Sequence, residues 1–135
     1  MSDPVFLDAS FWIAYRDEQE ARHAEARQGL TELFRARTRF VTTLPVLCEI
    51  HAYFARSRAK RELVLGDLWN NPLLAIEPVS PQDQEEAIAL LRASRDKSYP
   101  LCDATSFVVM RRLAITRVAA FDNHFRQFGE FQVIP

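Results

Sequence analysis

Short apolar segments that alternate with longer segments of helical periodicity are the feature that most restricts the fold of this chain. Apolar, β-branched and aromatic residues are concentrated at residues 5–7, 40–42, 73–79, 117–121 and 131–134, with helix-like segments between them. The sequence has three glycines and no hairpin turn signals. Strands that are joined through helices pair in parallel. We therefore predict an α/β fold with a mainly parallel central sheet of four to five strands flanked by helices.

Length and composition favour one domain, residues 1–135. The chain has 135 residues, of which 48% are hydrophobic, which is enough for one compact core, and no linker or repeat divides it. Its 17 basic and 18 acidic residues give a net charge of -1, so contact with a nucleic acid would need a local basic patch. The two cysteines, Cys48 and Cys102, form neither a disulfide framework nor a zinc motif. Without a leader or a long apolar run, we expect a cytoplasmic protein that does not enter a membrane.

Four acidic residues are predicted to meet at one edge of the sheet. Asp8 and Asp122 follow predicted strands, and Glu49 and Asp103 lie in the first turns of predicted helices. Parallel sheets bind ligands at the carboxyl ends of their strands. The neighbours of Glu49 and Asp103 at helical spacing suggest partial burial, which disfavours carboxylate charge unless a cation compensates. Oxygen ligands suit Mg²⁺ or Mn²⁺, so the four acids together predict a metal site that activates water at a phosphodiester.

Each acid also has a simpler interpretation when taken alone. Asp8 and Asp103 could cap helices, and Asp122 could be a turn residue, whereas capping does not explain Glu49. Aspartyl-phosphate chemistry at Asp8 would require a second aspartate at position 10, which is Ser10. A receiver domain would require an early acidic pair and a late lysine, and neither is evident. The joint placement of the four acids therefore favours the metal site.

The motifs FLDAS, LCEI, CDATSF and AFDNHF, in this order, resemble those of PIN-domain nucleases, and most of all the VapC-type toxins of type II toxin–antitoxin pairs. The resemblance implies a three-layer PIN-like fold and a Mg²⁺- or Mn²⁺-dependent endoribonuclease. It also implies that Asp8, Glu49, Asp103 and Asp122 are both the catalytic residues and the metal ligands. Small hydroxyl residues often support these acids in the family, and the matching positions are Ser10, Thr105 and Ser106. Ala9 stands where many relatives have threonine, so position 9 lacks a hydroxyl group.

The same resemblance implies three partners: an RNA substrate, a VapB-like antitoxin that blocks the acidic pocket, and a second copy of the chain in a homodimer. Two basic stretches could hold RNA phosphates, although such stretches are more often solvated helix ends. Their residues are Arg35, Arg37, Arg39, Arg58, Lys60 and Arg61. Two alternatives stay open, namely a PIN-like module that binds RNA or a partner without cleavage, and an RNA-processing nuclease that is not a toxin.

Histidines and cysteines carry weaker expectations. His124 lies close to Asp122, which would allow a general-base role, but we expect a surface residue. For Cys48 and Cys102 we expect small, buried, apolar side chains without a catalytic role.

Overall fold

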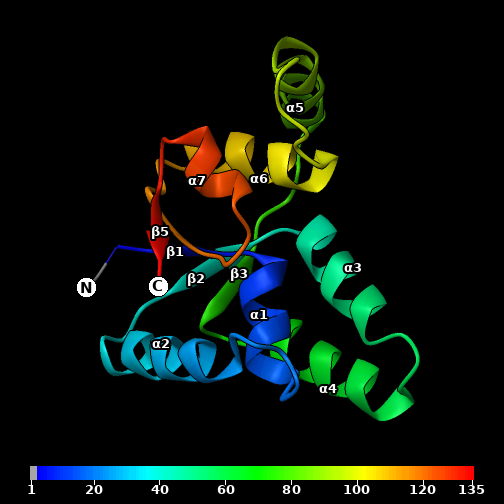
Figure 1. Ribbon diagram of the computed structural model, residues 1–135, viewed down its shortest axis with the longest axis vertical. Helices are drawn as coiled ribbons and strands as arrows, with labels where there is room; N and C mark the ends of the chain where they lie inside the picture. Colours follow the sequence, from blue (N-terminus) through cyan, green and yellow to red (C-terminus); the bar gives the residue numbers. More distant parts are fainter. Residues whose placement is uncertain (1–2) are drawn as a thin grey trace.

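A parallel sheet forms the centre of the protein, as predicted. The computed structural model describes residues 3–135, and within them five strands pair in the order β3-β2-β1-β4-β5, all parallel (Figure 1). The strands are β1 (Val5–Leu7), β2 (Phe40–Thr42), β3 (Leu74–Ile76), β4 (Arg117–Ala119) and β5 (Gln132–Ile134). The third, fourth and fifth strands lie inside the predicted segments and are shorter than these segments. The fold class is confirmed.

Seven helices in residues 3–135 cover the two faces of this sheet. They are α1 (Ala9–Arg16), α2 (His23–Arg35), α3 (Leu44–Tyr53), α4 (Arg58–Leu68), α5 (Pro81–Ala93), α6 (Leu101–Arg112) and α7 (His124–Phe128). Figure 1 shows α1 to α4 on one side of the sheet, α6 and α7 on the other, and α5 extending outward from α6. This is the three-layer arrangement that the resemblance implied. None of the helices described in this chain has the length and apolar character needed to cross a bilayer.

The central strand β1 is buried on both faces, which explains its uninterrupted apolar sequence. Phe6 is fully buried in the main core, together with Phe11 from α1 and Phe107 from α6. The ring of Phe107 stacks on Phe128, with centroids 4.2 Å apart. Each buried phenylalanine contributes about 1.5–3 kcal/mol through loss of apolar surface to water. These contacts hold α1, α6 and α7 rigidly around the carboxyl ends of β1 and β4.

A network of charged groups fixes α5 to α6. Ser80 and Asp83 form a capping box at the start of α5. Arg112 at the end of α6 donates from Nε to Asp83 Oδ1 at 3.0 Å and from one terminal nitrogen to Asp83 Oδ2 at 2.9 Å, while the other contacts Glu77. Although burial acts in the opposite direction, hydrogen bonds from Arg112 and Ser80 lower the pKa of Asp83.

Candidate metal centre

Asp8 and Asp122 come together because β1 and β4 are adjacent and parallel. The backbone N–H of Asp8 donates to the carbonyl oxygen of Ala119 at 3.0 Å, which joins the ends of the two strands. Asp8 caps α1, and Asp122 immediately precedes the short loop into α7. The first turn of α6 brings Asp103 to the same edge. The carboxyl edge of the sheet thus collects three of the four predicted acids from three separate segments.

Ser10 connects Asp8 to the loop that carries Asp122. Its Oγ donates to Asp8 Oδ2 at 2.5 Å and accepts from the backbone N–H groups of Phe121 at 3.0 Å and Asp122 at 3.4 Å. Thr105 and Ser106, the other two predicted supporting residues, instead donate to the carbonyl oxygens of Leu101 and Cys102, one turn earlier in α6. Of the three hydroxyl residues, Ser10 is therefore the one that holds an acid.

Asp8 is buried with an incomplete set of hydrogen bonds. The residue is 1% exposed, and its side-chain oxygen Oδ1 has no hydrogen-bond partner among the described residues. Burial, followed by the charge of Asp122, raises the pKa of Asp8 well above its usual value. An unpaired oxygen on a buried carboxylate is costly. A cation beside this oxygen would remove the cost.

Asp103 is also a buried acid whose charged form is disfavoured. The residue is 3% exposed, and burial together with the charge of Asp122 raises its pKa to about 6, although a hydrogen bond with His124 acts in the opposite direction. The carboxylates thus repel one another at neutral pH, and each disfavours the charged form of its neighbour. A cation bound between the carboxylates would offset this repulsion.

His124 belongs to this cluster, so the expectation of a surface residue was wrong. Its Nδ1 lies 2.7 Å from Asp103 Oδ2 and 3.6 Å from Asp122 Oδ1, and its side chain is 31% exposed. One ligand atom from each of Asp103, Asp122 and His124 lies within 4.8 Å of the other two. The sequence held one local signal, the position of His124 two residues after Asp122 at a helix start. The contact with Asp103 could not be inferred from that position.

Glu49 lies at the rim of the cluster and is exposed, contrary to the predicted partial burial. Val46 and Ile50 are on the buried face of α3, which turns Glu49 away from the core. Its charge nevertheless acts on the site, since it raises the pKa of Asp103 and, after burial, that of the Cys102 thiol. Cys102 is half-buried, whereas Cys48 is exposed, so the expectation of a buried side chain was wrong for Cys48.

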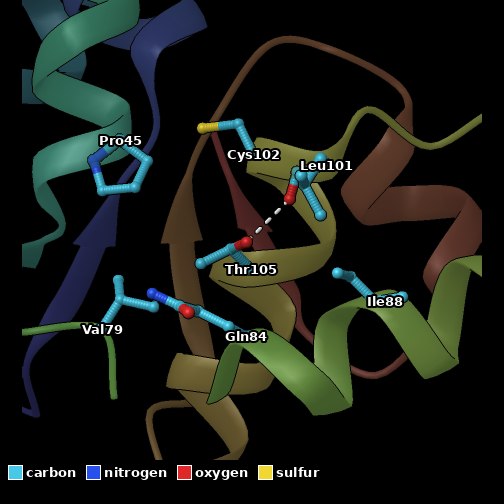
Figure 2. A pocket seen from close by; sticks show the side chains of 7 residues that line it. All are labelled: Pro45, Val79, Gln84, Ile88, Leu101, Cys102 and Thr105. Atoms are coloured by element: carbon cyan, nitrogen blue, oxygen red, sulfur yellow. Dashed lines mark hydrogen bonds between the residues drawn. The ribbon is translucent and has the colours of Figure 1, made fainter. Parts of the chain in front are cut away.

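A pocket of about 420 Å³ adjoins the acids. Figure 2 shows Cys102 and Thr105 of α6 facing Pro45 of α3 across it. Its full lining is Pro45, Val79, Gln84, Ile88, Leu101, Cys102 and Thr105. Leu101 and Ile88 are exposed apolar side chains. Burial and the charges of the acids, including Glu49 and Asp103, raise the pKa of the Cys102 thiol, so this wall of the pocket lies beside the charged cluster.

The two basic stretches lie away from the acids. Arg35, Arg37 and Arg39 precede β2, so they lie at the amino edge of the sheet, opposite the acidic edge. Arg58, Lys60 and Arg61 lie in the first turn of α4. Tyr53, at the end of α3, donates to Asp17, just after the last residue of α1. The end of α1 that is remote from Asp8 therefore lies beside the end of α3, which a short connection joins to α4. Contact of either stretch with RNA stays a prediction.

The donor set fits a divalent cation. Carboxylate oxygens from Asp8, Asp103 and Asp122 converge, one of them lacks a partner, and their mutual repulsion calls for positive charge. Oxygen-rich sites of this kind select hard cations.

Comparisons with known proteins agree with the fold. A family model described as PIN domain matches residues 5–130. The 23S rRNA-specific endonuclease VapC20 of Mycobacterium tuberculosis is 31% identical over 133 residues, covering 97% of this chain and 98% of that protein. The crystal structure of VapC20, described as a sarcin-ricin loop cleaving toxin, superposes with a TM-score of 0.84 and 28% identity over 97% of this chain and 99% of that one.

A more distant structure shares the fold alone. FitAcB from Neisseria gonorrhoeae gives a TM-score of 0.69 with 15% identity, covering 97% of this chain and 96% of that one. With the family model spanning most of the chain and VapC20 covered almost completely, the chain belongs to the PIN domain family, and its predicted resemblance to VapC-type toxin nucleases is confirmed.

Proposed function

We propose that this protein is a Mg²⁺- or Mn²⁺-dependent endoribonuclease and the toxin of a toxin–antitoxin pair. PIN nucleases generally depend on divalent metals. The observation that carries the proposal is the convergence of Asp8, Asp103 and Asp122, with a buried Asp8 oxygen that has no partner among the described residues. The names of the VapC20 relatives, an endonuclease and a cleaving toxin, support the same reaction class.

In this proposal Asp8, Asp103 and Asp122 hold the metal, and Glu49 completes the acidic set from the rim. When bound there, Mg²⁺ or Mn²⁺ would supply Lewis acidity and would make water a better nucleophile at neutral pH. Ser10 keeps Asp8 fixed relative to the loop of Asp122 through its three hydrogen bonds. Glu49, exposed on α3, faces solvent, from which both water and RNA arrive.

For the RNA, we propose that a nucleobase next to the scissile phosphate occupies the pocket beside Cys102. The exposed side chains of Ile88 and Leu101 offer an apolar wall for the face of a base. The side-chain amide of Gln84 has no hydrogen-bond partner among the described residues, so it is free to donate to and accept from a base edge. By similarity to VapC20, the first RNA to test is a sarcin–ricin loop of 23S rRNA.

An antitoxin and a second copy of the chain are the proposed protein partners. Leu63 and Leu65 of α4 and Trp69 at its C-terminal cap are exposed, with exposed fractions of 47%, 37% and 58%. Apolar side chains that gather on one helix favour a protein partner. The VapC-type relatives support an antitoxin in this role, and the homodimer rests on the family resemblance.

The decisive experiment is cleavage of the sarcin–ricin loop RNA with Mg²⁺ or Mn²⁺ by the wild type, Asp8→Asn and Asp103→Asn. Asp3→Asn is a matched control, since Asp3 is exposed and precedes β1 at the opposite edge of the sheet. We expect cleavage by the wild type and the control, and none by the other two variants. Equal cleavage by all four proteins would contradict the proposal. RNA binding without cleavage by the wild type would favour the binding module instead.

The toxin role has its own test. Expression in a bacterium without an antitoxin should arrest growth, and the Asp103→Asn variant should not. Active enzyme in vitro together with normal growth would favour an RNA-processing nuclease.

A further inference from the structure

We propose that His124 is a protein ligand of the metal through Nδ1, and that this nitrogen makes the site prefer Mn²⁺ to Mg²⁺. The inference rests on the metal site proposed above and adds a residue outside the acidic set. It concerns a side chain that sequence reasoning assigned to the surface.

Nδ1 of His124 lies at a distance from two carboxylates that suits a shared metal. With bonds of about 2.1 Å, two ligand atoms on an octahedral cation lie roughly 3.0 Å apart when adjacent and roughly 4.2 Å apart when opposite. Nδ1 of His124 lies 2.7 Å from Asp103 Oδ2 and 3.6 Å from Asp122 Oδ1. These separations fit one coordination sphere with small shifts. The nitrogen is therefore already placed where a ligand should be.

The fold fixes the position of the imidazole ring. The backbone N–H of His124 donates to Asp122 Oδ1 at 3.0 Å, so the residue is tied to the carboxylate that shares the site. The next residue, Phe125, is fully buried and packs against Phe107. The imidazole ring also meets the edge of Tyr99, with centroids 6.1 Å apart. The ring therefore needs little reorganisation to bind a metal.

Asp8 supports a cation at this edge independently of His124. Asp8 is 1% exposed and its Oδ1 has no hydrogen-bond partner among the described residues, which itself points to a cation at this edge.

Three carboxylates and one imidazole form a mixed oxygen and nitrogen donor set. Imidazole suits transition metals, whereas Mg²⁺ favours oxygen and retains water. The nitrogen ligand should thus discriminate between the two cations.

A different role for His124 makes the opposite prediction. If the imidazole only formed an ion pair with Asp103 and Asp122, it would compete with the metal for the same oxygens. Its removal would then strengthen metal binding. The sign of the change in affinity therefore separates a ligand from a competitor.

The test measures binding of MnCl₂ and MgCl₂ to the full chain by calorimetry, for wild type, His124→Gln and the matched control His51→Gln on α3. For His124→Gln we expect Mn²⁺ affinity to fall by about tenfold or more, the scale of a disturbed metal site, and Mg²⁺ affinity to fall much less. Pulsed electron paramagnetic resonance of the Mn²⁺ protein should show ¹⁴N coupling in wild type and control, and not in His124→Gln.

Each other result has a defined meaning. Mn²⁺ binding by the wild type without ¹⁴N coupling would overturn the role of His124 and leave the acidic site intact. Tighter Mn²⁺ binding by His124→Gln would also overturn it, in favour of the competing ion pair. A wild type that binds neither cation would overturn the proposed metal-dependent function itself.

Discussion

Replacement of Asp103 by asparagine should stabilise the protein at neutral pH when divalent metals are removed by a chelator. Burial and the charge of Asp122 raise the pKa of Asp103 from 3.8 to about 6, so the folded state binds this proton more tightly than the unfolded state does. The raised pKa therefore lowers the free energy of unfolding as pH rises from about 4 to about 6. A shift of this size corresponds to roughly 3 kcal/mol at pH 7.

Asparagine removes the charge and keeps an oxygen that can accept a hydrogen bond from His124. We therefore expect Asp103→Asn to be more stable than wild type at pH 7.5, by up to about 3 kcal/mol. The difference should shrink towards pH 4, where Asp103 is protonated in the wild type. Urea denaturation at pH 4.5, 6 and 7.5 in the presence of EDTA measures this difference.

Metal should reverse the order of stability. At a concentration about one thousand times its dissociation constant, a cation that binds only the folded state adds about 4.1 kcal/mol to the wild type, and much less to a variant that has lost a ligand. The reasoning would be refuted if Asp103→Asn were less stable than wild type at pH 7.5 with EDTA and had the same dependence on pH. That result would mean that the acids do not repel one another in the folded protein.

Three further predictions test other parts of the structure. Asp83 is as buried as Asp103, but it is paired with Arg112. In urea denaturation, Asp83→Asn should therefore lower the free energy of unfolding by about 2–3 kcal/mol, a change opposite in sign to that of Asp103→Asn. A stabilised variant would contradict this pairing. Ser10→Ala should weaken metal binding by about tenfold in calorimetry, because Asp8 loses its positioning partner; unchanged affinity would show that this hydroxyl does not position the ligand. Gln84→Ala should raise KM for the RNA roughly fivefold with kcat unchanged, since one hydrogen bond to a base is worth about 1 kcal/mol; an effect on kcat alone would exclude a role in binding the base.

The parallel sheet and two of the acids could be predicted because they depend on local patterns. An apolar strand such as Val5–Leu7 is buried on both faces, and the residue that follows it reaches the carboxyl edge whatever the rest of the chain does. Asp8 follows directly from this rule, and Asp122, three residues after the end of β4, lies near the same edge. The same rule also places Arg35, Arg37 and Arg39 at the opposite edge, because they precede a strand. Their assignment to RNA came from charge alone, without regard to the direction of the strand.

The exposure of Glu49 could not be predicted, because α3 is apolar on more than one face. Leu44 and Tyr53 at its ends are 53% and 49% exposed, whereas Val46 and Ile50 are fully buried. When apolar residues lie all around a short helix, their spacing does not indicate which face meets the core. The choice is made by packing against α1, which a single sequence does not reveal. Glu49 thus reaches the cluster from the solvent side.

His124 shows where the limit lies. Its link to Asp122 is local and is fixed by a hydrogen bond between residues that are close in sequence. Its link to Asp103 joins α7 to α6, and it requires that both helices begin at the same edge of the sheet. The four acids could be assigned to one site from the sequence because they are all carboxylates, and carboxylates that lie close together repel one another unless a cation is bound. A single histidine causes no such repulsion, so only the 2.7 Å separation of Nδ1 and Asp103 Oδ2 places it in the site.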